Sequence, residues 1–177
     1  MSVAANRYAR ALLDVLYPKN AEAGYDQLNQ FNAILSQEPE ARRLLENPTV
    51  PVERRKALVK EIAGAMGALS QIRNFVDILI DRNRLELLHE IITTYRKYLD
   101  QKLGIVRATV TAATPLDETQ RMALVTKLQQ ATGKQVRMDV SVDPSLLGGI
   151  VARVDSTIYD GSLRQRLQSF RERLVES

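Results

Sequence analysis

No cysteine occurs among the 177 residues of this chain. Disulfide bonds, thiolate metal sites and a cysteine nucleophile are therefore excluded, although this absence does not by itself fix the cellular compartment. Histidine is almost as scarce, because His89 is the only one. It falls on the polar side of a leucine-rich helical segment, where a lone histidine is typical of a surface or structural position. No nucleophile lies at a recognisable spacing from it, so the sequence does not indicate acid–base catalysis.

Long apolar runs are also missing. No stretch approaches the ~20 apolar residues that a membrane-spanning helix needs, and no apolar run follows a basic segment near the N-terminus. We therefore expect a soluble protein of cytoplasmic type. Blocks of like charge are absent too, because the 25 basic and 21 acidic residues, which give a net charge of +4, are interspersed. This balance permits a nucleic-acid partner without indicating one.

What the sequence does contain is a long region of helical periodicity. From about residue 3 to residue 104, apolar side chains recur every three or four positions, as in amphipathic helices. Pro39 and Pro51 lie near predicted helix starts, where a missing N–H costs little. The apolar stripe of the last segment suits the spine of a helical bundle. Six helices are expected, at residues 3–17, 22–36, 38–46, 51–66, 69–82 and 85–103.

The apolar period changes from about 3.6 to 2 after Gly104, which predicts a domain boundary there. Strands are expected near 106–112 and 135–142, with a helix between them. Asp117 and Gln120 have the spacing of a capping box, and Gly133 stands where that helix ends. We therefore predict a mostly α protein of two domains, a six-helix bundle over 1–104 and a small α+β module over 105–177.

The C-terminal part carries the most distinctive run of the sequence. Ile150, Ala152 and Val154 alternate with other residues as in a half-buried strand. The preceding Gly148-Gly149 pair indicates a positive φ, a bulge or a close backbone approach, and it lacks the flanking Gly-Lys-Ser/Thr of a phosphate-binding loop. A turn at Asp155-Ser156 and a short return strand over 157–159 complete a hairpin.

A helix is predicted to follow this hairpin. Asp160-Gly161 breaks the strand, and Ser162 with Gln165 has capping-box spacing. The helix would carry one apolar stripe on an otherwise basic surface. The stripe consists of Leu163, Leu167, Phe170 and Leu174.

The run from Leu147 to Leu167 resembles the C-terminal signature of the delta subunit of F-type ATP synthase, whose mitochondrial relative is the oligomycin sensitivity conferring protein. Asn6-Arg7-Tyr8-Ala9-Arg10-Ala11-Leu12 is similar to the opening helix of that family. The length also suits a full-length member, so the resemblance spans the chain. One departure is the Asp155-Ser156 turn, where the family commonly has a Gly-Asp type turn.

The resemblance implies a non-catalytic stator subunit that links the catalytic head to the membrane-anchored stalk. In this role it would resist rotor torque during proton-driven ATP synthesis, without a cofactor or metal of its own. The implied location is the cytoplasmic face of a bacterial plasma membrane, as a peripheral part of the complex. The implied partners are the N-terminal helix of an alpha subunit for the bundle and the C-terminal end of the b subunits for the α+β module.

The first helix has a wider apolar face than burial on one side requires, because its apolar residues cover an arc of about 200°. In the fifth helix, Ile78 lies well to one side of the core stripe. Two such helices side by side would form a groove for an amphipathic partner helix. Burial of both helices on two sides within the bundle explains the same pattern, and the spacing alone leaves both explanations open.

The resemblance favours the groove, because the family holds the alpha-subunit helix between its first and fifth helices. Tyr8 and Ala11 match the opening motif, and Ile78 stands at the corresponding place in the fifth helix. Leu12 and Val15 extend that face by geometry. These five residues are the predicted partner-binding set.

Two alternatives belong to other functional classes. A basic nucleic-acid-binding module is suggested by the arginines of the terminal helix, although no aromatic platform accompanies them. A small enzyme is the second alternative, and the poverty of acid–base groups argues against it. The arginines concerned are Arg164, Arg166, Arg171 and Arg173.

Overall fold

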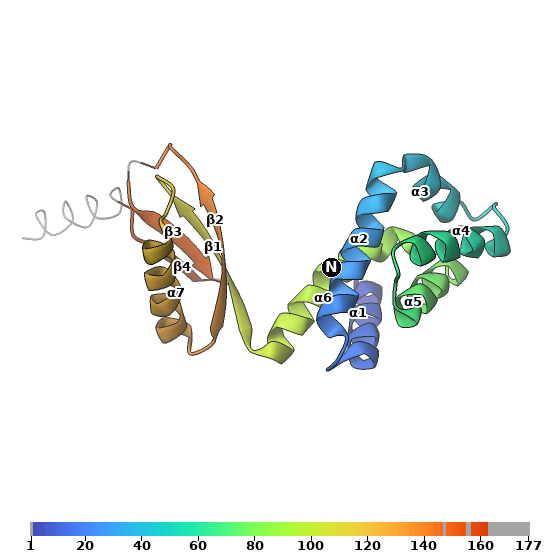
Figure 1. Ribbon diagram of the computed structural model, residues 1–177, viewed down its shortest axis with the longest axis horizontal. Coiled ribbons are helices and arrows are strands. Elements are labelled where there is room, and N and C mark those ends of the chain that lie inside the picture. Colours follow the sequence, from blue (N-terminus) through green and yellow to red (C-terminus); the bar gives the residue numbers. More distant parts are fainter. Residues whose placement is uncertain (1, 147, 155–156, 163–177) are drawn as a thin grey trace, which may run out of the picture. The chain divides into compact units, whose positions relative to one another are not determined.

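The computed structural model describes residues 2–146, 148–154 and 157–162 of the chain. By their internal contacts the residues divide into two compact units, Met1–Leu99 and Asp100–Ser177. Figure 1 shows helices in the first unit and a sheet with a helix in the second. The chain is thus mostly helical with one small sheet, which agrees with the predicted fold class at this level.

The first unit consists of helices joined by short connections. Ser2 caps the first of them, because its side chain accepts a hydrogen bond from the backbone N–H of Ala5. Pro39 occupies the first turn of its helix, as predicted. Residues 85–87, expected as the start of the last long helix, form a separate 3₁₀ turn. The elements are α1 Val3–Leu16, α2 Ala21–Gln37, α3 Pro39–Glu46, α4 Val52–Ala65, α5 Ser70–Asp81, η1 Leu85–Leu87 and α6 Leu88–Leu103, of which the last residues fall in the second unit.

Large apolar side chains fill the core of the first unit. Tyr95 has no exposed surface, and its hydroxyl donates a 2.9 Å hydrogen bond to the carbonyl oxygen of Ala21. Burial raises the pKa of Tyr95 to about 12, because the phenolate would lose its hydration. The largest fully buried apolar side chains around it are Phe31, Leu13, Leu28, Leu45, Ile72, Leu79, Ile80, Ile91 and Leu99.

The second unit is built on a four-stranded sheet of order β2-β1-β3-β4. Strands β1 and β2 are parallel, so α7 crosses between them, whereas β3 runs antiparallel to β1 and pairs with β4. Helix α7 lies against one face of the sheet (Figure 1), where Ala108, Val110 and Ala152 are buried with Leu128. The elements are β1 Ile105–Ala112, α7 Glu118–Thr132, β2 Gln135–Val142, β3 Ile150–Val154 and β4 Thr157–Asp160.

The turn chemistry predicted for this unit is confirmed where the structure describes it. Asp117 and Gln120 form a capping box at the start of α7, and Gly133 ends it in the left-handed conformation at φ 66°. Gly149 has φ 85°, and a Cβ atom there would lie 2.4 Å from the carbonyl oxygen of Gly161. The predicted close backbone approach is therefore present. The Asp155-Ser156 turn, Gln165, the terminal apolar stripe and its four arginines lie outside the described residues.

Candidate partner-binding groove

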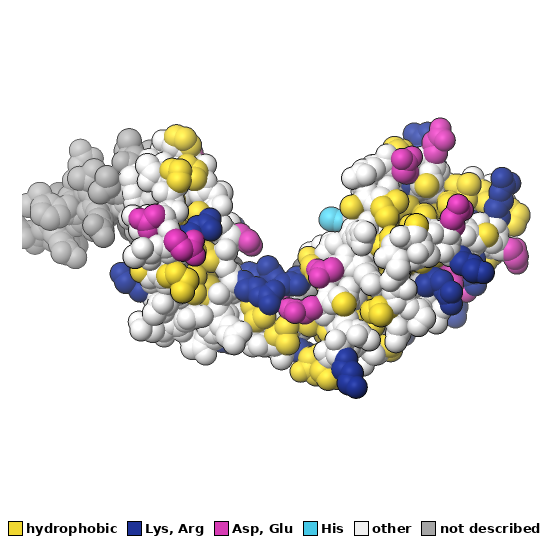
Figure 2. Space-filling view, viewed as in Figure 1, with side chains coloured by type: hydrophobic (Ala, Val, Ile, Leu, Met, Phe, Trp, Pro, Cys, Tyr) yellow, Lys and Arg dark blue, Asp and Glu magenta, His cyan; other side chains and the backbone are white. Residues whose placement is uncertain are grey.

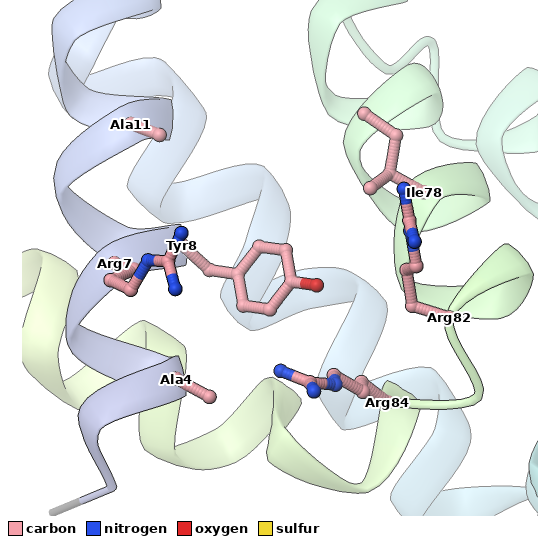
Figure 3. A pocket seen from close by; sticks show the side chains of 7 residues that line it. All are labelled: Ala4, Arg7, Tyr8, Ala11, Ile78, Arg82 and Arg84. Carbon is pink, nitrogen blue, oxygen red and sulfur yellow. The ribbon is translucent and has the colours of Figure 1, made fainter.

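A surface hollow of about 490 Å³ lies between α1 and α5 in the first unit (Figure 3). Helix α1 contributes Ala4, Tyr8 and Ala11, which share a face because they are spaced by four and three residues. Helix α5 contributes Ile78 from the opposite side. We call this hollow the groove. The described residues that line it are Ala4, Arg7, Tyr8, Ala11, Ile78, Arg82 and Arg84.

The structure brings together three of the five predicted partner-binding residues, Tyr8, Ala11 and Ile78. Ile78 is 48% exposed, which is unusual for an isoleucine on a helix that packs into a core. Val15 is 67% exposed and continues the α1 face one turn beyond Ala11, although it does not line the groove itself.

The expectation that Leu12 extends the exposed face is wrong. Leu12 is only 4% exposed and belongs to the core cluster of the first unit. It follows Ala11 by one position, so it points about 100° further around the helix, toward the buried side. The wide apolar arc of α1 thus divides into a part that is buried within the first unit and a part that is open.

Tyr8 joins the two walls of the groove. Its ring meets that of Phe75 on α5 edge to face, with centroids 6.2 Å apart and planes at 76°. Figure 3 shows the ring lying across the groove with its hydroxyl directed toward the α5 side. Such edge-to-face pairs stabilise a contact by about 1 kcal/mol beyond area burial, so Tyr8 holds α1 against α5 while leaving part of its ring open.

Three arginines line the groove and were not among the predicted residues. Arg7 belongs to α1, whereas Arg82 and Arg84 lie just after α5. Their place in the groove depends on how α5 ends. Asn83 adopts the left-handed conformation at φ 49°, its N–H donates to Ile80, and the N–H of Arg84 donates to Leu79. This is the Schellman arrangement, and it turns the chain back along the helix.

The buried side chain of Arg55 stabilises this turn through a hydrogen bond to Asn83. Arg55 on α4 is 2% exposed, and its Nη1 donates a 2.9 Å hydrogen bond to the side-chain oxygen of Asn83. Arg55 forms no ion pair with any described residue. It borders a small cavity of about 30 Å³ together with Asn83. The segment that carries Arg82 and Arg84 is therefore fixed to the core of the first unit.

The groove offers binding chemistry and no catalytic group. Among the described residues that line it there is no acidic residue or histidine, and the phenol of Tyr8 is the one hydroxyl group. Among the described residues, no group of three or more His, Cys, Asp or Glu is arranged to hold a metal ion. Charges of both signs are interspersed over the face of the first unit that Figure 2 shows, so this face carries no broad basic patch.

A second hollow, of about 450 Å³, lies in the second unit between the end of β1, α7 and the start of β3. Small residues and backbone form much of its lining, including Ala112, Gly148 and Gly149. Leu116 and Leu124 add apolar side chains, and Lys127 is the one charged residue among the described residues that line it.

Residues 4–174 match the family described as ATP synthase delta (OSCP) subunit. The chain belongs to this family. A relative from a species of Anaeromyxobacter, named ATP synthase subunit delta, is 41% identical over 177 residues, which are 99% of each chain. The predicted family is thus confirmed across nearly the whole sequence.

Solved structures agree with this assignment at the level of the fold. One chain in the Toxoplasma gondii mitochondrial ATP synthase hexamer superimposes with a TM-score of 0.65 at 23% identity, covering 99% of this chain and 98% of that chain. A chain in the Polytomella F-ATP synthase, from a refinement of the F1 head and rotor, gives a TM-score of 0.51 at 26% identity, covering 58% of this chain and 91% of that chain.

Family membership answers the question of functional class. The chain is a non-catalytic peripheral-stalk subunit of F-type ATP synthase, as the resemblance implies. Neither the matches nor the groove support the nucleic-acid-binding alternative, and the arginines that suggested it lie outside the described residues. None of the helices in the described part of the chain is long and apolar enough to span a bilayer.

Proposed function

We propose that the first unit binds the N-terminal helix of an alpha subunit in the groove, and that the second unit binds the C-terminal end of the b subunits. The observation that carries the proposal is the meeting of Tyr8, Ala11 and Ile78 in one open hollow between α1 and α5. These residues come from helices far apart in sequence, and no described segment covers them. An amphipathic helix with an apolar stripe fits such a surface.

The role of such a contact is mechanical. The subunit would hold the catalytic head still while the rotor turns, so each attachment must dissociate slowly under load. Slow dissociation comes from buried, well-packed anchors, because exposed charge pairs alone contribute only about 0–1 kcal/mol each. The apolar floor of the groove provides such anchors. The Polytomella chain of similar fold, which comes from a refinement of the F1 head and rotor, is in keeping with an attachment on the head side.

We further propose that the chain works as two domains, 1–104 and 105–177, with a boundary near Gly104 that falls a few residues after the division by internal contacts at Leu99 and Asp100. Helix α6 ends there, Gly104 has φ 65°, and residues 101–104 are exposed. Such a connection would let each domain engage its own partner. As a subunit of a bacterial-type complex, the protein would work at the cytoplasmic face of the plasma membrane.

Calorimetry with the full-length chain and a synthetic peptide of the alpha-subunit N-terminus from the same organism tests the groove. Ala11→Asp and Ile78→Asp place a charge against the apolar stripe of the peptide, so we expect each to weaken binding by about tenfold or more. Val15→Asp should have a smaller effect, because Val15 lies beyond the groove proper.

The matched control is Met122→Asp on α7, which replaces a 61% exposed apolar residue outside the groove with the same charge. It should leave the affinity unchanged. Equal affinity for the Ala11, Ile78 and Met122 variants would exclude the groove as the alpha-subunit site.

A further inference from the structure

We propose that Arg82 and Arg84, together with Arg7, recognise acidic side chains on the helix that occupies the groove. This inference rests on the proposed function, since it assumes that a helix binds there, and it adds the chemistry by which that helix is selected. The expected occupant is an amphipathic helix with Asp or Glu beside its apolar stripe, within the N-terminal segment of the alpha subunit.

The lining of the groove places cationic side chains next to apolar ones. Figure 3 shows Ala11 and Ile78 facing each other at one end, and Ala4 facing Arg84 at the other. The guanidinium group of Arg84 extends toward α1, and that of Arg7 lies near the ring of Tyr8. The side chain of Arg82 runs alongside Ile78 in the same view, so a helix lying along the groove would meet apolar surface flanked by cationic groups.

These cations are uncompensated within the described part of the chain. Arg7, Arg82 and Arg84 form no ion pair with a described residue, and no acidic residue lines the groove. Three like charges around one hollow repel each other, at a cost that falls with salt. A carboxylate placed among them would relieve that repulsion. Guanidinium groups are well suited to this, because their fork of N–H donors matches a carboxylate.

The helix dipole does not account for the three positions. A cation is favoured near a helix C-terminus, which applies to Arg82 at the end of α5. It does not apply to Arg7, which lies near the N-terminal end of α1, or to Arg84, which lies beyond the helix. What the three arginines share is that they line the groove.

The backbone that carries the two arginines after α5 is held in place before any partner arrives, although both side chains are exposed. The Schellman turn fixes the backbone on both sides of Asn83, and the buried guanidinium of Arg55 anchors the side chain of Asn83. Pre-organised groups lose less conformational entropy on binding than mobile ones, so their contacts contribute more to affinity. An arginine pair on a fixed turn can therefore discriminate between an acidic and a neutral partner.

The test is a double-mutant cycle with the full-length chain, measured by calorimetry. One arm compares the wild type with Arg82→Gln/Arg84→Gln; the other compares the alpha-subunit N-terminal peptide with a version in which Asp and Glu become Asn and Gln. We expect the double variant to bind the native peptide about tenfold or more weakly than the wild type does. The neutral peptide should bind the double variant and the wild type with the same affinity. The salt dependence of binding should also be shallower for the variant.

Arg43→Gln/Arg54→Gln is the matched control, because it removes two exposed arginines of α3 and α4 and the same charge. If the groove variant binds like this control while Ile78→Asp abolishes binding, the inference is wrong and the proposed function stands. If Ile78→Asp also binds normally, the proposed function itself fails. Recovery of Arg84→Glu by a peptide with Lys in place of its acidic residues would support the inference independently.

Discussion

The two units carry hollows of similar size but of different construction. The groove, of about 490 Å³, is lined by side chains of α1, of α5 and of the turn after α5, including three arginines and a tyrosine. The second hollow, of about 450 Å³, is lined largely by small residues and backbone, with Gly148 and Gly149 at one border. The surface of the groove is therefore formed by side chains, whereas the shape of the second hollow depends on the path of the backbone.

Because of this difference, exposed residues that line the groove of the first unit can be substituted without loss of stability, whereas residues that line the second hollow also maintain the fold. Exposed groove residues such as Ala11 and Arg84 can change without altering the core beneath them. Gly149 cannot, because its place in the wall of the second hollow is also a close contact with Gly161. The following substitutions test the comparison, starting with the largest expected effect.

Gly149→Val should destabilise the second unit by on the order of 3 kcal/mol or more. The φ of 85° disfavours any side chain, and a Cβ atom would lie 2.4 Å from the Gly161 carbonyl oxygen, which is backbone and cannot swing aside. Hydrogen exchange should rise in peptides from β3 and β1 and stay unchanged in peptides from α1 and α5.

Gly133→Ala is the control for this prediction. It has a similar φ of 66° but no atom within 4 Å of an added Cβ. It should cost only the backbone strain, about 1–2 kcal/mol. Equal losses for the two variants would show that the close contact at Gly149 contributes nothing.

Arg55→Ala should destabilise the first unit by about 3 kcal/mol, since it removes a large buried side chain and the hydrogen bond to Asn83. Arg55→Met keeps most of the aliphatic volume and should cost about 1 kcal/mol. Arg54→Ala, the exposed neighbour on α4, should stay within about 0.5 kcal/mol in the same denaturant titration. Equal losses for the Ala and Met variants would assign the effect to the guanidinium group instead of to packing.

Tyr95→Phe should cost about 1–2 kcal/mol near neutral pH, because it leaves the Ala21 carbonyl without its 2.9 Å partner. The loss should shrink as the pH rises. Native Tyr95 keeps its proton until its raised pKa of about 12, whereas unfolded tyrosine loses its proton near the model-compound value of 10.0. Between these values the unfolded state binds fewer protons, so the wild type loses up to about 3 kcal/mol of stability that the Phe variant keeps.

Unfolding titrations between pH 8 and about pH 12 would show this as two curves that converge and then cross. Tyr159→Phe is the control in the second unit, because Tyr159 is 40% exposed. Because this hydroxyl lies in the other unit, the substitution should leave the free energy of unfolding of the first unit at the wild-type value. A constant difference between wild type and Tyr95→Phe across this range would contradict the raised pKa.

Local sequence signals predicted most of the elements but missed the 3₁₀ turn between α5 and α6. The apolar period of α1 and α5, the capping box at Asp117 and the left-handed Gly133 all act over a few residues, so they can be recognised without tertiary information. The 3₁₀ turn at 85–87 follows the left-handed Asn83 and the end of α5, which the period alone does not reveal.

The groove was only partly predictable for a related reason. Tyr8, Ala11 and Ile78 follow from helix geometry together with the family resemblance. The position of Leu12 does not, because the sequence does not show which part of the apolar face of α1 the neighbouring helices bury. Arg82 and Arg84 reach the groove through the Schellman turn. The available signal was an asparagine directly after a predicted helix, which favours a left-handed cap.

The capping box gives the smallest test and concerns α7, a helix with one buried side chain. Only Leu128 of α7 is buried, so the helix depends more on its ends than a core helix does. Asp117→Ala removes the 2.7 Å hydrogen bond from the Gln120 N–H and should cost about 1 kcal/mol. Glu118→Ala removes an equal charge from the first turn without a cap and should cost at most about 0.5 kcal/mol in urea unfolding. If both variants lose the same stability, the negative charge at the start of α7 stabilises the helix and the cap hydrogen bond does not. Backbone contacts would then contribute less to the stability of the second unit than we infer from Gly149.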